Sequence, residues 1–155
     1  MNANGSELLD LPLPIRVEYY AGAASGWLPS AGDSCTTIIP SNFAFSFPVG
    51  TTSKPNNLAA CETAMSVTGS APSYTLTLSR PGAGNEGWAD VSLNLGATAA
   101  GNACAAVGVS SPAASTANAP WLQYNWTGAG VANPSARATF GVFRSGPVIH
   151  MREYY

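Results

Sequence analysis

Hydrophobic and polar residues alternate with a period of two along much of the chain, which indicates β-strands with one buried face. No stretch repeats apolar residues at helical spacing for three turns, and Gly or Pro interrupts nearly every window. With the shorter candidates, we expect about eight to ten strands in an all-β fold, an antiparallel two-layer β-sandwich or a jelly-roll-like double sheet. The candidate strands are residues 15–20, 36–39, 43–49, 64–68, 74–79, 89–95, 121–126, 137–143 and 148–155.

Two pairs of these runs predict hairpins. Residues 74–79 and 89–95 flank a Gly-rich turn, whose Gly82, Gly84 and Gly87 fit the letters of a dinucleotide-binding motif. That motif must lead from a strand into a helix, so we interpret the segment as a turn between strands. Residues 137–143 and 148–155 are joined by Arg144-Ser145-Gly146-Pro147 and predict a terminal hairpin. The last run has apolar residues on both faces, which favours a place inside a sheet.

Two further segments carry positional information. Pro12 and Pro14 alternate with Leu11 and Leu13, and proline donates no hydrogen bond to a neighbouring strand. We therefore expect this segment at a sheet edge, or a strand that begins only at Ile15. Residues 96–120 are rich in Ala, Ser, Gly and Asn and predict a long loop, either a functional excursion or a simple insertion.

The composition indicates one domain and excludes several classes of partner. The 155 residues suit a single domain, residues 1–155, and only 9% of them are charged, with a net charge of −2. Scattered basic residues exclude a nucleic-acid interface, which needs clustered Lys and Arg. No apolar run approaches the ~20 residues that cross a bilayer, so we expect no membrane insertion by this domain. We expect any secretion signal to lie upstream of residue 1.

Cys35, Cys61 and Cys104 are too widely spaced for a zinc site, which usually uses close cysteine pairs. In an exported chain two of the three should oxidise. We expect a Cys35–Cys61 disulfide, because it closes the smallest loop and both residues flank candidate strands. The alternative is three inert buried thiols in a reducing compartment.

No residue set demands a reaction. The chain has one histidine, His150, no G-x-S-x-G nucleophile elbow and no recognisable pair of catalytic carboxylates. We therefore expect neither enzymatic activity nor a cofactor. Aromatic residues crowd one short segment and, with neighbouring polar groups, are candidates for a binding surface: Trp121, Gln123, Tyr124, Asn125 and Trp126. In a strand, Trp121 would face away from Tyr124 and Trp126, and the alternative is that at least one face is core.

Several stretches together resemble a bacterial domain of unknown function at the C-terminal end of MshQ-like proteins, which are associated with biogenesis of the mannose-sensitive haemagglutinin pilus, a type IV pilus. The resemblance rests on residues 4–20, Asp33-Ser34-Cys35-Thr36, residues 76–85, residues 133–144 and Arg152-Glu153-Tyr154-Tyr155. Members often carry an Asp-rich stretch before the Pro-Ser-Ala segment. This chain has Asn125-Trp126-Thr127-Gly128-Ala129-Gly130 there, so we predict no tightly bound calcium and no metal site.

The resemblance implies the C-terminal module of a larger exported protein, extracellular or at the cell surface. We consider two functions, the first favoured by the resemblance and the absence of a catalytic residue set, the second by the aromatic segment from Trp121 to Trp126. The first is a non-catalytic structural or assembly module whose partners are other domains of its parent protein or pilus components. The second is an adhesin-like or carbohydrate-binding module that contacts a surface glycan, and aromatic side chains exposed in a concave patch would favour it.

Overall fold

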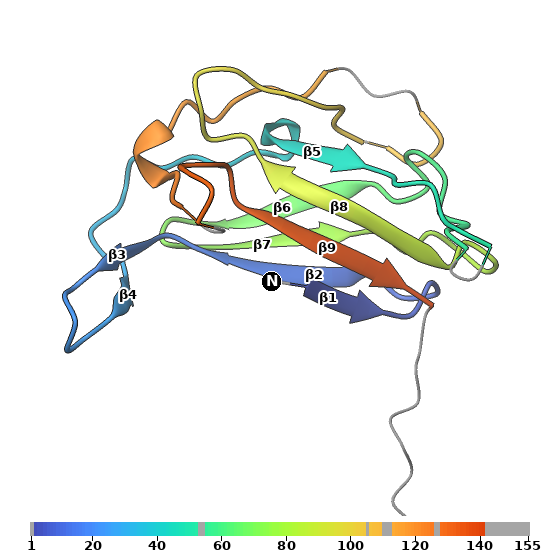
Figure 1. Ribbon diagram of the computed structural model, residues 1–155, viewed down its shortest axis with the longest axis horizontal. Helices are drawn as coiled ribbons and strands as arrows, with labels where there is room; N and C mark the ends of the chain where they lie inside the picture. Colours follow the sequence, from blue (N-terminus) through green and yellow to red (C-terminus); the bar gives the residue numbers. More distant parts are fainter. Residues whose placement is uncertain (1, 53–54, 105, 110–112, 126–127, 142–155) are drawn as a thin grey trace, which may run out of the picture.

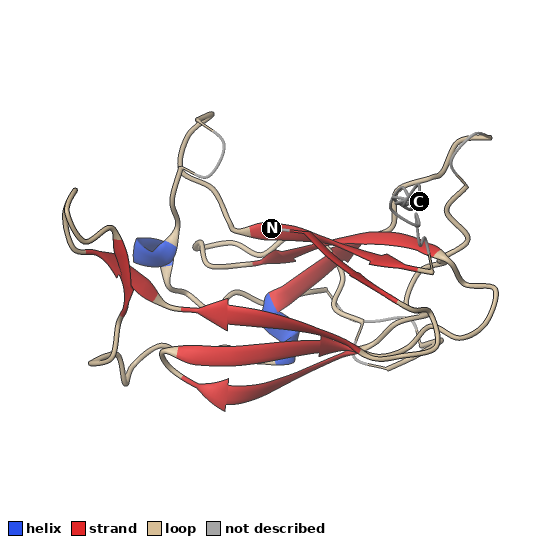
Figure 2. Ribbon diagram, turned by 90° about the horizontal axis from the view of Figure 1, so that it is seen from below, coloured by secondary structure: helices blue, strands red, loops and turns tan. Residues whose placement is uncertain are grey.

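The computed structural model describes residues 2–52, 55–104, 106–109, 113–125 and 128–141, and these form an all-β domain. Two sheets lie face to face, as predicted (Figures 1 and 2). A four-stranded sheet has the order β1-β9-β8-β5, and a three-stranded sheet has the order β2-β7-β6. A small β3-β4 hairpin projects from one end. The strands are β1 (Asn2–Gly5), β2 (Leu11–Arg16), β3 (Glu18–Tyr20), β4 (Trp27–Pro29), β5 (Phe43–Ser46), β6 (Met65–Ser70), β7 (Ser73–Leu78), β8 (Gly87–Leu93) and β9 (Ser135–Phe140).

The alternation seen in the sequence builds the core between the two sheets. In β7, Tyr74, Leu76 and Leu78 are buried while the residues between them are not. They face β8 and β9, where Val91 and Phe140 are buried from the other side. Burying one such side chain contributes about 1.5–3 kcal/mol, so these facing rows hold the sheets together.

The predicted hairpin between residues 74–79 and 89–95 is wrong. Strand β7 pairs with β6 through a tight turn at Ala71-Pro72 and with β2 on its other side. Strand β8 lies in the other sheet, between β5 and β9. The Gly-rich segment does join two strands, but it crosses from one sheet to the other. Alternating apolar and polar residues show where a strand lies but not which strand it pairs with, and this explains the error.

The predicted terminal hairpin is only partly testable. Its first strand exists as β9, with β8 on one side and β1 in parallel pairing along Arg137–Phe140 on the other. Both sides of β9 along Arg137–Phe140 are therefore occupied by other strands. Residues 148–155 themselves, including His150, lie outside the described residues.

The edge prediction for Pro12 and Pro14 is confirmed. Strand β2 begins at Leu11 and is an outer strand of its sheet. The amide of Val17 donates to the carbonyl of Pro72 at 2.8 Å, so Val17 and alternate residues before it turn their amides towards β7. Pro12 and Pro14 fall on the outward positions, where a missing N–H presents no donor to a neighbouring chain.

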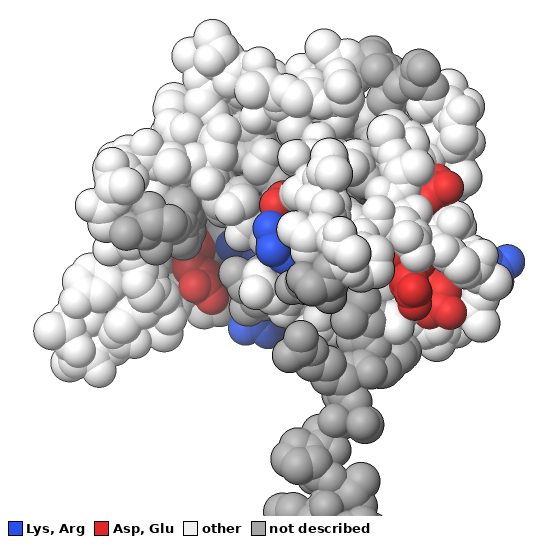
Figure 3. Space-filling view, turned by 45° about the vertical axis from the view of Figure 1, so that its right-hand side comes forward, with Lys and Arg blue, Asp and Glu red and all other residues white. Residues whose placement is uncertain are grey.

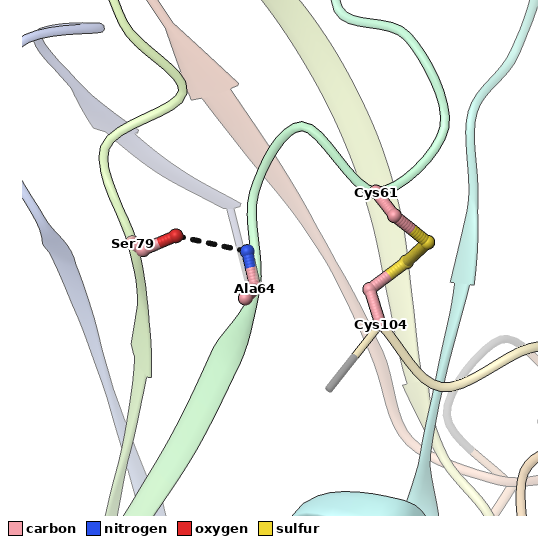
Figure 4. The surroundings of a disulfide bond; sticks show 4 residues. All are labelled: Cys61, Ala64, Ser79 and Cys104. Atoms are coloured by element: carbon pink, nitrogen blue, oxygen red, sulfur yellow. Dashed lines mark hydrogen bonds between the residues drawn. A yellow bond between two sulfur atoms is a disulfide. The ribbon is translucent and has the colours of Figure 1, made fainter. Parts of the chain in front are cut away.

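The disulfide joins Cys61 to Cys104, with a Cα–Cα distance of 5.2 Å (Figure 4), so the predicted Cys35–Cys61 pairing is wrong. Cys35 is exposed and has a free thiol. The smallest-loop argument considered only chain entropy. Backbone bonds instead bring residues 61 and 104 together: Met65 N–H donates to the Cys104 carbonyl at 3.1 Å, and Gly108 N–H donates to the Cys61 carbonyl at 2.9 Å.

Asn56 replaces a strand at the edge of β8. Strand β5 ends opposite Asp90, and beyond that point the Asn56 side chain bonds both backbone groups of Trp88. Its amide nitrogen donates to the carbonyls of Trp88 at 2.9 Å and Pro48 at 2.7 Å, and its oxygen accepts the Trp88 N–H at 2.9 Å. With the Leu58 N–H, which donates to the same oxygen at 3.4 Å, one side chain therefore bonds four backbone groups.

Replacing both Cys61 and Cys104 by Ala should lower the free energy of unfolding by about 4 kcal/mol, because the bridge closes a loop of 43 residues. Urea denaturation measures this, with Cys35→Ser as the control that should change little. Peptide mapping without reduction should recover the Cys61–Cys104 link, and a linked peptide containing Cys35 would contradict the structure.

Asn56→Ala should destabilise the domain, because each buried backbone group left without a partner costs about 1–3 kcal/mol. The matched control is Asn57→Ala, whose side chain makes only a 3.5 Å contact to Glu86. Equal losses of stability in the two variants, measured by urea denaturation, would show that Asn56 has no special role.

Candidate functional site

One end of the sandwich holds a cleft of about 440 Å³. The β3-β4 hairpin and the short 3-10 helix η2 (Pro120–Leu122) lie beside each other at this end (Figures 1 and 2). We call the space between them the aromatic cleft, and its lining residues are Ile15, Arg16, Val17, Glu18, Trp27, Ile38, Leu93, Leu95, Trp121, Leu122, Gln123, Tyr124, Asn125 and Pro134.

Aromatic rings form the wall of the cleft. Trp27 and Tyr124 meet edge to face, with ring centroids 5.1 Å apart and an interplanar angle of 81°. The Tyr20 ring also packs against Trp27, with ring centroids 5.5 Å apart. Trp121 is 71% exposed, Tyr124 47% and Trp27 46%. Rings gathered at one site and still about half exposed offer a largely apolar surface to a ligand.

The backbone explains how Trp27 reaches this position. Gly22 and Gly26 adopt positive φ angles in the turn between β3 and β4. The amide of Ala21 donates to the Gly26 carbonyl at 2.8 Å, and the amide of Ser30 donates to the Val17 carbonyl at 2.9 Å. The turn and this anchor fold the hairpin back so that Trp27 stands over the cleft.

Four of the five predicted binding residues line the cleft, and the fifth, Trp126, lies outside the described residues. The strand predicted over residues 121–126 is absent from the described part of that segment. Pro120 instead starts a single turn of 3-10 helix, and only Tyr124 makes an isolated bridge, to Ala132. The turn brings Trp121 and Tyr124 to the same cleft, whereas a strand would have separated them.

Gln123 and Asn125 have a different local role from the aromatic residues. The Gln123 side-chain nitrogen donates to Asn133 Oδ1 at 2.8 Å, and that oxygen also accepts the Leu95 N–H at 3.0 Å. Asn125 Oδ1 accepts the Gly130 N–H at 3.1 Å. These bonds hold the segment in place, so both residues position the aromatic wall as well as lining the cleft.

Sequence reasoning missed Trp27, Tyr20, Arg16 and Glu18. A signal was available for two of them, because Tyr20 and Trp27 flank a short Gly-containing segment that reads as a hairpin turn. Cross-strand aromatic pairs are common in hairpins, and Tyr20 is indeed opposite Trp27. Nothing in the spacing connected this hairpin to residues 121–125, which lie about a hundred positions further along.

The cleft is lined mostly by apolar and aromatic residues, with few charged ones. Arg16 and Glu18 are the charged residues among its lining. Within the described ranges, no three His, Cys, Asp or Glu residues come together in a way that could hold a metal ion. Stacking on the rings and hydrogen bonding at the rim are the interactions available.

The described residues contain no helix with the length and apolar character of a membrane span.

Neither the comparison with curated proteins nor the comparison with solved structures returned a match. A family model described as DUF6701, fourth domain, matches residues 1–154. The chain therefore belongs to the DUF6701 family, as its fourth domain, a domain of unknown function.

Proposed function

We propose that this domain is a non-catalytic recognition module of an exported, MshQ-like surface protein, and that it binds a saccharide in the aromatic cleft. The observation that carries the proposal is the exposure of Trp27, Tyr124 and Trp121 around one concave site. A sugar ring has apolar C–H faces and a polar hydroxyl edge. Aromatic walls with a few polar groups at the rim match that division.

The uncharged surface supports a recognition role over electrostatic capture. Figure 3 shows charged side chains as small, separated groups on a face that is mostly neither acidic nor basic. With a net charge of −2, the protein exerts no strong field on a charged partner. A neutral, hydroxyl-rich ligand requires no such field.

Export is supported by the disulfide. Cys61 and Cys104 are both buried, and a structural disulfide persists in oxidising compartments while cytosolic thiols are kept reduced. We therefore propose an extracellular or cell-surface location. Together with the resemblance to the C-terminal module of MshQ-like proteins, this supports a role in a pilus-associated surface protein.

The second candidate is the structural or assembly module, and the floor of the cleft favours it. Ile15, Val17 and Leu93 line the cleft beneath the aromatic rings. An aliphatic floor also suits an apolar side chain inserted from another domain of the parent protein or from a pilus component. Ligand binding by the isolated domain separates the two candidates.

Trp27→Ala should weaken saccharide binding at least about tenfold, which corresponds to ~1.4 kcal/mol, because it removes the central ring of the wall. A glycan array identifies the ligand and isothermal titration measures the affinity. The matched control is Tyr19→Ala, which removes an equally exposed aromatic residue from the opposite face of the same hairpin.

Two results would contradict the proposal. The first is the absence of any enriched glycan for the folded domain. The second is equal affinity of the Trp27→Ala and Tyr19→Ala variants for the enriched glycan. Binding of the isolated domain to a neighbouring domain of its parent, lost in Trp27→Ala, would support the assembly module instead.

A further inference from the structure

We infer that the cleft selects a neutral saccharide unit with two adjacent hydroxyl groups, which Arg16 and Glu18 bind together. The inference rests on the proposed function and adds the chemical class of the ligand. Both residues line the cleft, at the end of β2 and the start of β3. They are two charged residues in a chain where only 9% of residues carry charge.

Val17 fixes the placement of the pair. Its side chain is buried, its amide donates to the Pro72 carbonyl at 2.8 Å, and its carbonyl accepts the Ser30 N–H at 2.9 Å. Arg16 and Glu18 on either side of it are both exposed. The backbone between the two charged residues is therefore held by the core and by both neighbouring segments.

The charged groups of Arg16 and Glu18 are not engaged with each other. Among the described residues, the one ion pair is elsewhere: Arg137 Nε lies 2.7 Å from Asp90 Oδ1, and neither residue lines the cleft. In the described part of the chain, no carboxylate lies within 4 Å of the Arg16 guanidinium and no basic group lies within 4 Å of the Glu18 carboxylate. A guanidinium and a carboxylate that have no ion-pair partner in the described part of the chain can both turn to a ligand in the cleft.

The chemistry of the pair specifies what it can bind. A guanidinium only donates hydrogen bonds and a carboxylate only accepts them, whereas a hydroxyl group does both. Two adjacent hydroxyls can accept from Arg16 and donate to Glu18, and hydrogen bonds to charged groups are the stronger kind. A ligand carboxylate would be attracted by Arg16 but repelled by Glu18, and a ligand ammonium the reverse, so neither charge can use both groups. Two hydroxyls can use both groups without repulsion, and the pair therefore favours a neutral sugar over acidic and amino sugars.

The test uses the whole domain and defined small probes. Methyl glycosides of neutral hexoses are compared by isothermal titration with their monodeoxy derivatives and with the matching uronic acid and amino sugar. Removing one of the two recognised hydroxyls should weaken binding about tenfold, and the charged sugars should also bind more weakly. Arg16→Gln and Glu18→Gln should each weaken binding of the neutral glycoside by a similar factor.

A pairwise comparison makes the test specific. Each variant should bind the monodeoxy sugar that lacks its partner hydroxyl almost as well as the unmodified protein does. The unmodified protein makes no hydrogen bond to the missing hydroxyl either, so the substitution removes nothing. Arg80→Gln is the control, since Arg80 is exposed and does not line the cleft. Circular dichroism confirms that each variant is folded.

The outcomes separate this inference from the proposed function. If glycosides bind in a Trp27-dependent way, but deoxygenation and the two Gln variants change nothing, the pair has no role and the saccharide function stands. Tighter binding of the uronic acid, improved by Glu18→Gln, would overturn the preference for a neutral ligand. Absence of binding by every sugar, or binding of a zwitterionic dipeptide alone, would overturn both.

Discussion

The close packing of two sheets through their alternating apolar faces is the constraint on which the rest of this structure depends. Leu78 and Phe140 are fully buried where the sheets meet, and a one-residue shift of either strand would turn them to solvent. Burial of these side chains therefore fixes the pairing register of the strands, and with it the positions at which the paired strands end. Strand β2 stops at Arg16 and β8 stops at Leu93, and the chain that leaves these two ends surrounds the cleft.

The long loop after β8 is part of this packing. It contributes Ala103, Cys104 and Ala119 to the core, and the disulfide ties it to the segment before β6. Its backbone also bonds the two residues that follow β8, since Ala117 N–H donates to the Asn94 carbonyl and Ala119 N–H to the Leu95 carbonyl, both at 2.9 Å. These bonds place Pro120 directly beside the sheet, so the turn that carries Trp121 starts from a fixed point.

Features that depend on local pattern could be predicted from the sequence, and features that depend on topology could not. Alternation located most of the strands, and Pro12 and Pro14 identified an edge, because each property belongs to a few adjacent residues. The pairing of β7 with β2, the disulfide between Cys61 and Cys104 and the contact of Trp27 with Tyr124 each join segments distant in the sequence. The aromatic segment was recognised for its composition, but its shape followed from Pro120 and from the anchoring of Ala119.

The cleft combines a rigid part with a weakly supported one. Val17 and the ends of β2 and β8 belong to the packed core, whereas β3 and β4 have three residues each, all exposed, and pair only with each other among the described strands. A two-stranded hairpin of this size is marginally stable alone. Its contact with the body through Trp27 and Tyr124 therefore contributes to its position, and a ligand stacked on these rings would add to the same contact. The two charged residues of the cleft therefore differ in support, because Arg16 ends β2 in the packed body whereas Glu18 begins β3 and depends on the hairpin's contact through Trp27 and Tyr124.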